Sequence, residues 1–109
     1  MRIDVITTTP NNLETAIFNA VSNGTLTTYE LKTLNTGERR LTPIGNQFKD
    51  IITVKFERVT NENILRVTFN FMNDKPRPTE ALYAIVLGMV TAMLVTHFKT
   101  YYAKIEIIA

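Results

Sequence analysis

Residues 51–72, with the sequence IITVKFERVTNENILRVTFNFM, alternate apolar and polar side chains on both sides of a short polar turn. Successive side chains of a β-strand point to opposite faces, so this alternation gathers the large apolar residues on one face. That face contains Ile52, Val54, Phe56, Leu65, Val67, Phe69 and Phe71. The pattern predicts an antiparallel hairpin with one buried face, and such a face needs a second layer to cover it.

The longest uncharged stretch of the chain follows this hairpin, EALYAIVLGMVTAMLVTHFK at residues 80–99. Its length reaches the lower limit for a membrane-spanning helix. The basic residues on its two sides, however, show no asymmetry of the kind that orients a membrane span. The strands also need this helix as their cover, because a second helix pattern, at residues 9–24, is too short to cover them alone. We therefore expect a core helix over residues 78–98 and no membrane association.

Strand patterns also occur at residues 2–7 (RIDVIT), 26–34 (LTTYELKTL) and 100–109 (TYYAKIEIIA). The resulting order, β-α-β-β-β-α-β, predicts the α+β class and a two-layer sandwich. We expect a mainly antiparallel sheet of four or five strands covered by two helices. A ferredoxin-like arrangement with one added strand is the leading expectation for the topology. The chain length predicts one domain, residues 1–109.

Residues 33–50 form an arm between these elements, with one proline and two glycines. The arm is expected to fold back as a short hairpin, or to add a third layer to the domain. Four basic residues lie in or beside it, Lys32, Arg39, Arg40 and Lys49. Arginine contacts phosphate or carboxylate through two parallel hydrogen bonds, which makes these residues candidates for anion or nucleic-acid contact. The alternative is that Arg39 and Arg40 are simply solvated at a hairpin tip.

The expected helix at residues 78–98 has two uncharged faces of different size. One arc collects large side chains such as Leu82, Val86, Met89, Val90, Met93 and Leu94. The opposite arc carries small ones, and Gly88 within it costs a helix about 1 kcal/mol relative to alanine. One sheet covers only one of these faces, and an uncovered apolar face usually marks an interface. The candidate interface residues are Ala84, Gly88, Thr91, Ala92 and Val95.

The sequence offers little material for catalysis. It contains no cysteine, which excludes disulfides, thiolate chemistry and cysteine-based metal sites. The only histidine, His97, and the only serine, Ser22, lie at the ends of the two expected helices, and no hydrolase, nucleotide-binding or metalloprotease motif is present. Aspartate and glutamate side chains can meet in space without forming a local sequence motif. The sequence therefore does not exclude a catalytic site made of paired carboxylates. We expect no catalytic residue, metal site, cofactor or small-molecule substrate.

Twelve basic and ten acidic residues are interleaved, giving a net charge of only +2 and no basic footprint. The expected function is that of a small non-enzymatic protein-binding module (an inhibitor, an immunity-type protein or an adaptor). It would act by stoichiometric association and form a homodimer through the helix at residues 78–98. The competing hypothesis is a homo-oligomeric nucleic-acid-associated protein, a small regulator or phage structural protein, that contacts phosphates through residues 32–49. The N-terminus, MRIDVITTT, has no signal-peptide pattern, which predicts a cytoplasmic location.

Overall fold

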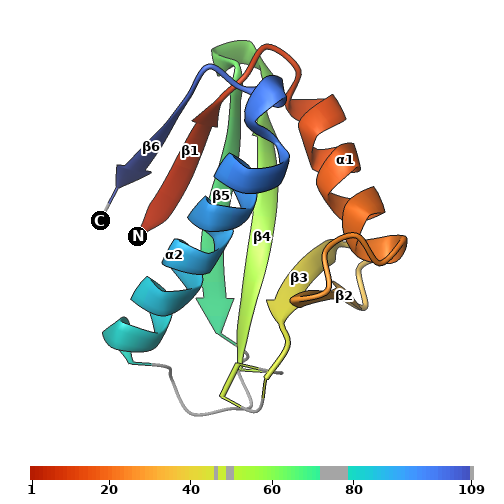
Figure 1. Cartoon of the computed structure of the whole chain (residues 1–109), viewed down its shortest axis with the longest axis vertical. Helices are drawn as coiled ribbons and strands as arrows, with labels where there is room; N and C mark the ends of the chain where they lie inside the picture. Colours follow the sequence, from red (N-terminus) through yellow and green to blue (C-terminus); the bar gives the residue numbers. More distant parts are fainter. Residues whose placement is uncertain (46, 49–50, 72–78, 109) are drawn as a thin grey trace.

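The computed structural model describes residues 1–45, 47–48, 51–71 and 79–108. Two helices lie on one face of a six-stranded antiparallel sheet, so the domain has two layers (Figure 1). In chain order the elements are β1 (Arg2–Ile6), α1 (Pro10–Ser22), β2 (Tyr29–Thr33), β3 (Arg39–Pro43), β4 (Ile52–Val59), β5 (Ile64–Phe71), α2 (Glu80–His97) and β6 (Lys104–Ile108). The expected α+β class, antiparallel sheet and two helices are confirmed.

The hairpin predicted at residues 51–72 is formed by β4 and β5, which pair along their whole length. Its inward residues lie beneath the helices. Six of them have less than a tenth of their surface exposed, namely Ile52, Val54, Phe56, Leu65, Val67 and Phe69. The turn contains Asn63 at φ 56°, a left-handed conformation that asparagine tolerates better than most residues. The Asn63 carbonyl accepts a hydrogen bond from the Thr7 amide at 2.8 Å, which ties the turn to the end of β1.

The sheet has six strands rather than the four or five expected, in the order β2-β3-β4-β5-β1-β6. The additional strand is β3, which comes from the arm at residues 33–50 and pairs with the whole of β2. It joins β4 through Leu41, which lies opposite Val54. The described part of the arm therefore extends the sheet, and the expectation of a third layer is wrong.

The remaining elements follow the connectivity that the sequence suggested. Without β2 and β3, the chain runs β1-α1-β4-β5-α2-β6, and the spatial order of its strands is β6-β1-β5-β4. Each helix thus connects two strands that have one other strand between them. These connections are split β-α-β crossovers, and the hairpin of β2 and β3 extends the sheet beyond β4.

Helix α1 anchors the side of the sheet that carries this hairpin. Its residue Phe18 is 1% exposed and meets the Phe56 ring edge-on, with the ring centroids 5.5 Å apart. The Arg39 guanidinium of β3 lies 4.6 Å from the centroid of the Phe18 ring. Phe18 therefore joins α1, β3 and β4 through apolar, aromatic and cation–π contacts.

Helix α2 lies on the same face of the sheet as α1 (Figure 1). Its large side chains cover the part of that face away from the β2–β3 hairpin. The Thr79 hydroxyl accepts a hydrogen bond from the Leu82 amide at 3.2 Å and caps the helix N-terminus. The buried residues of α2 are Val86, Val90, Met93 and Leu94. The sequence left open which face meets the sheet, and in the structure it is the large-residue face.

Candidate functional site

The small-residue face of α2 points away from the sheet. Four of the five predicted interface residues, Ala84, Gly88, Ala92 and Val95, are exposed. Thr91 is half-buried at the margin of this face, and its hydroxyl donates a hydrogen bond to the Leu87 carbonyl at 2.8 Å. The structure thus brings the predicted residues onto one surface, which we call the outer face of α2.

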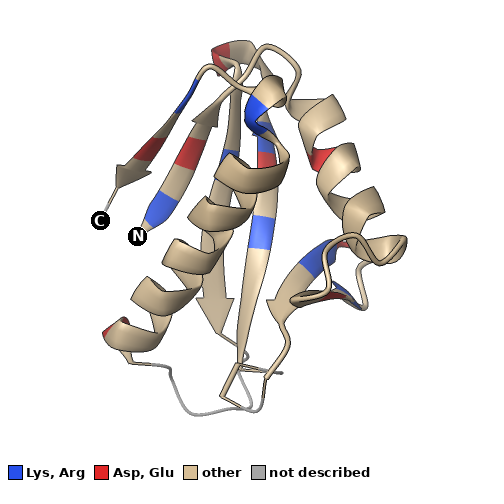
Figure 2. Cartoon of the chain, in the orientation of Figure 1, with Lys and Arg blue, Asp and Glu red and all other residues tan. Residues whose placement is uncertain are grey.

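Two large apolar side chains flank the small residues on this surface. Ile85 is 53% exposed and Val95 is 50% exposed. Figure 2 shows that α2 carries a charge only at its first residue, Glu80, so no charged side chain interrupts the outer face. A helix that packs on a sheet usually has a polar outer side, and the outer face of α2 lacks one.

Gly88 lies at the middle of this surface without a steric requirement from its own chain. Apart from its chain neighbours and the adjoining backbone of α2, a Cβ atom built at Gly88 meets no atom within 4 Å. Its backbone also lies outside the positive-φ region, where glycine is favoured over other residues. Within the described part of the chain, neither packing nor backbone conformation requires glycine at this position.

By length and composition, α2 is also the one described helix that qualifies as a membrane span. Of the 18 residues in that window, 22% are buried inside the domain. The same test is passed by core helices of proteins that contain no membrane segment, so the result does not by itself assign α2 to a membrane.

The basic residues of the arm do not converge on one site. Lys32 and Arg40 lie opposite each other in the β2–β3 pair, so they share one sheet face, whereas Arg39 lies on the other. Arg40 bonds Glu38 at 3.1 Å and the Thr53 hydroxyl at 3.3 Å. Arg39 packs on an aromatic ring of α1, as described above, and Lys49 lies outside the described residues.

The sheet face opposite the helices carries charges of both signs. Asp4 of β1 is 4% exposed and accepts a hydrogen bond from Arg66 Nε at 3.0 Å. Arg2 Nε lies 3.4 Å from the same carboxylate. Farther along the sheet, Glu38 lies 3.7 Å from Lys55 Nζ. Because these cations lie beside carboxylates, this face is not a uniformly basic surface of the kind that binds phosphates.

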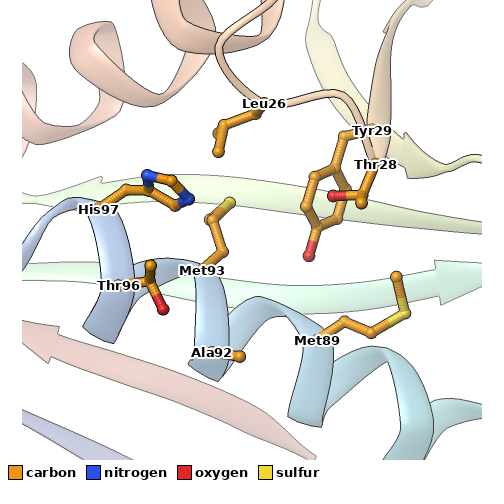
Figure 3. A pocket seen from close by; sticks show the side chains of 8 residues that line it. All are labelled: Leu26, Thr28, Tyr29, Met89, Ala92, Met93, Thr96 and His97. Atoms are coloured by element: carbon orange, nitrogen blue, oxygen red, sulfur yellow. The ribbon is translucent and has the colours of Figure 1, made fainter.

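An apolar cavity of about 290 Å³ opens between α2 and the segment that joins α1 to β2 (Figure 3). Its lining comes from separate parts of the chain and comprises Leu26, Thr28, Tyr29, Met89, Ala92, Met93, Thr96 and His97. Burial raises the pKa of the Tyr29 hydroxyl to about 12. Sequence reasoning missed this cavity because its residues form no local motif, and it treated His97 only as a residue at a helix end.

A second, polar cleft of about 480 Å³ lies between α1 and the ends of β3 and β4. It is lined by Glu14, Gly37, Glu38, Arg39, Phe56, Glu57 and Arg58. Glu14 Oε2 lies 3.1 Å from Arg58 Nε. The contact is an ion pair without a hydrogen bond, because that oxygen has no hydrogen-bond partner among the described residues.

The substitution Glu14→Gln is expected to change the free energy of unfolding in a pH-dependent way. Relative to the wild type, the variant should be more stable at neutral pH than it is at acidic pH. Burial raises the pKa of Glu14 above its ordinary value, and the nearby Arg58 and Arg39 offset this only in part. The folded state therefore holds the proton more tightly than the unfolded chain does. The cost of ionising Glu14 is absent below the ordinary carboxyl pKa and grows as pH rises through the raised pKa. Urea unfolding of both proteins at acidic and neutral pH measures this, and a difference that is independent of pH would contradict it.

Within the described ranges, no group of three histidine, aspartate or glutamate side chains is placed to hold a metal ion. The candidate surfaces are the outer face of α2, the apolar cavity beside it and the polar cleft; two further hollows, of about 310 and 260 Å³, lie around Thr8. Comparison of the chain with protein-family models, curated proteins and solved structures finds no match.

Proposed function

We propose that this protein is a small non-enzymatic protein-binding module that forms a homodimer through the outer face of α2. It acts by stoichiometric association, as an inhibitor, an immunity-type protein or an adaptor does, and works in the cytoplasm. The observation that carries the proposal is Gly88, which costs the helix stability and has open space around it.

The chemistry of the outer face supports this proposal. A helix contact needs small residues where two backbones approach and larger apolar residues beside them. Ala84, Gly88 and Ala92 provide the first, and the half-exposed Ile85 and Val95 provide the second. Exposed apolar area of this kind is removed from water when a second copy packs against it. A homodimer needs the same patch on both copies, and this face contains no charge that would repel its own copy.

Gly88→Ala is expected to stabilise the folded monomer by about 0.5–1 kcal/mol, because alanine is the better helix former and its methyl group meets no side chain and no other element. Gly88→Leu also fits the open space of the monomer but keeps two helices apart. The expected result is a rise in thermal stability at high dilution for Ala and a loss of self-association for Leu. Differential scanning calorimetry and sedimentation velocity give the two readouts. If Gly88→Ala destabilises the diluted protein, then Gly88 has a role inside the monomer and this support for the proposal is lost.

The mass in solution tests the proposal. Light scattering coupled to size exclusion is expected to give twice the chain mass of 12.4 kDa at high concentration and a fall toward 12.4 kDa on dilution. A single species of 12.4 kDa at all concentrations would contradict the homodimer. Binding to lipid vesicles through α2, measured by flotation, would contradict the choice of a protein partner.

The competing hypothesis of nucleic-acid association has less support. Arg39 and Arg40 each contact a side chain of their own chain, and they point to opposite faces of β3. Titration of the protein with random DNA and RNA over a range of salt concentrations separates the two hypotheses. When the logarithm of the binding constant is plotted against the logarithm of the salt concentration, each phosphate contact on B-DNA contributes about −0.9 to the slope. We expect no binding at low salt, and binding with a steep slope would favour the competing hypothesis.

A further inference from the structure

The apolar cavity beside α2 is lined by a tyrosine, Tyr29, whose hydroxyl is free to bond a ligand. Tyr29 is only 4% exposed, and no described residue forms a hydrogen bond with its hydroxyl. Figure 3 shows the Tyr29 side chain reaching from β2 toward α2, with its hydroxyl between Met89 and Met93. The hydroxyl oxygen itself is accessible from the cavity, because it is not among the fully buried polar atoms that lack a hydrogen bond. It can therefore donate a hydrogen bond to a molecule that enters the cavity.

The other groups of the lining define the chemistry of that molecule. Met89, Met93, Leu26 and Ala92 make most of the wall apolar, and methionine side chains adapt to ligands of irregular shape. The polar groups around the wall are the hydroxyls of Thr28 and Thr96 and the ring of His97, all of which can donate a hydrogen bond. No carboxylate lies in the lining. The cavity therefore suits an apolar body with a hydrogen-bond acceptor, and it offers no counter-charge to a cation.

The size of the cavity limits the ligand to a small molecule. Its volume of about 290 Å³ lies at the lower end of the roughly 300–1,000 Å³ typical of ligand sites. Two residues of its lining at the C-terminal end of α2, Thr96 and His97, are exposed, so a ligand can enter there without unfolding the domain.

We propose that this cavity binds a small amphiphile, a short hydrocarbon chain with a carboxylate head that accepts a hydrogen bond from the Tyr29 hydroxyl. The apolar chain lies along Met89 and Met93. This inference is independent of the homodimer proposed above, because it rests on the cavity and not on the outer face of α2. Ala92 is the one residue that belongs to both surfaces.

Octanoate is the probe for the test, and the methyl resonances of methionine and alanine report where it binds. We expect saturable shifts at Met89 and Met93 on titration with octanoate. Tyr29→Phe removes only the hydroxyl and is expected to weaken binding about 3- to 10-fold, the usual worth of one hydrogen bond. The variant should fold as the wild type does, because it keeps the buried ring and removes only a hydroxyl that bonds no described residue. Tyr101→Phe, which removes a hydroxyl from a tyrosine outside the cavity, is the matched control and should bind octanoate as the wild type does.

Octylammonium has the same chain and a head without an acceptor, and it should bind more weakly than octanoate. Three outcomes overturn the proposal. The first is the absence of saturable shifts at Met89 and Met93. The second is equal affinity of wild type and Tyr29→Phe for octanoate. The third is a set of shifts confined to Ala84 and other residues of the outer face of α2, which would place the apolar binding surface there.

Discussion

Gly88→Glu on the outer face of α2 is expected to convert the proposed dimer into a monomer. A carboxylate at this position would lie between two apolar helix faces. Each copy of the chain would contribute one such carboxylate. Leaving an unpaired charge in a buried contact costs about 3–5 kcal/mol, and each 1.4 kcal/mol changes an affinity tenfold. The dimer dissociation constant should therefore rise by at least about 100-fold, measured by sedimentation equilibrium.

The control for this variant is Thr15→Glu, which places the same charge on an exposed position of α1. It should leave the dissociation constant unchanged apart from a small effect of net charge. Gly88→Glu should also fold at high dilution with at least wild-type stability, because Glu is a better helix former than Gly. A variant that remains dimeric would contradict the assignment of the interface to this face.

Phe18→Ala is expected to destabilise the domain by about 3–5 kcal/mol, the usual cost of removing a buried phenylalanine ring. The ring is 1% exposed and contacts both Phe56 and the Arg39 guanidinium. The loss therefore combines the cavity in the core with the loss of the ring–ring and cation–π contacts. Because small domains have only about 5–15 kcal/mol of stability in total, a large part of the protein's stability depends on this residue.

Urea denaturation measures this loss as a lower midpoint at an unchanged m-value. Phe18→Leu keeps an apolar side chain in the same space and should lose less than half as much stability. If Phe18→Ala costs less than about 1 kcal/mol, the packing of α1 against β3 and β4 is not as described.

Much of the fold was predictable because its strands have one polar and one apolar face. The alternation in residues 51–72 gave the β4–β5 hairpin and its inward residues, and the strands at both chain ends followed from the same period. The interleaved connectivity also followed, since it is a common way to arrange this order of elements in two layers. These signals are local, and local patterns are what a single sequence reveals most directly.

The strand β3 was expected only as part of a short hairpin arm and was not counted as a strand of the sheet, because its local signal is weak. Its five residues are RRLTP, with Leu41 as the one large aliphatic side chain, and Pro43 would normally exclude a strand from a sheet interior. Pro43 is tolerated because it lies at the last position of β3, where a missing amide hydrogen disturbs little of the pairing. Pairing with β2 determines this strand, and pairing partners are not visible in a local pattern.

The candidate sites were predictable only in part. The small residues of α2 were found from helical spacing, but the side that meets the sheet was not, because both faces of the helix are uncharged. In the structure the large side chains are buried, since they remove more apolar area from water. The cavity beside α2 escaped prediction because Leu26, Tyr29 and Met93 are brought together only by the packing of separate elements.

The most direct test of the central claim uses the absence of cysteine from the chain. Gly88→Cys introduces a single thiol at the point where the two helices are expected to cross. A disulfide requires Cα atoms about 4.4–6.8 Å apart, a distance that only a close helix contact provides. Mild oxidation of Gly88→Cys is predicted to give a covalent dimer rapidly and at low protein concentration, while Thr15→Cys on α1 stays monomeric. Equal, slow cross-linking of both variants would contradict an interface between copies at the outer face of α2.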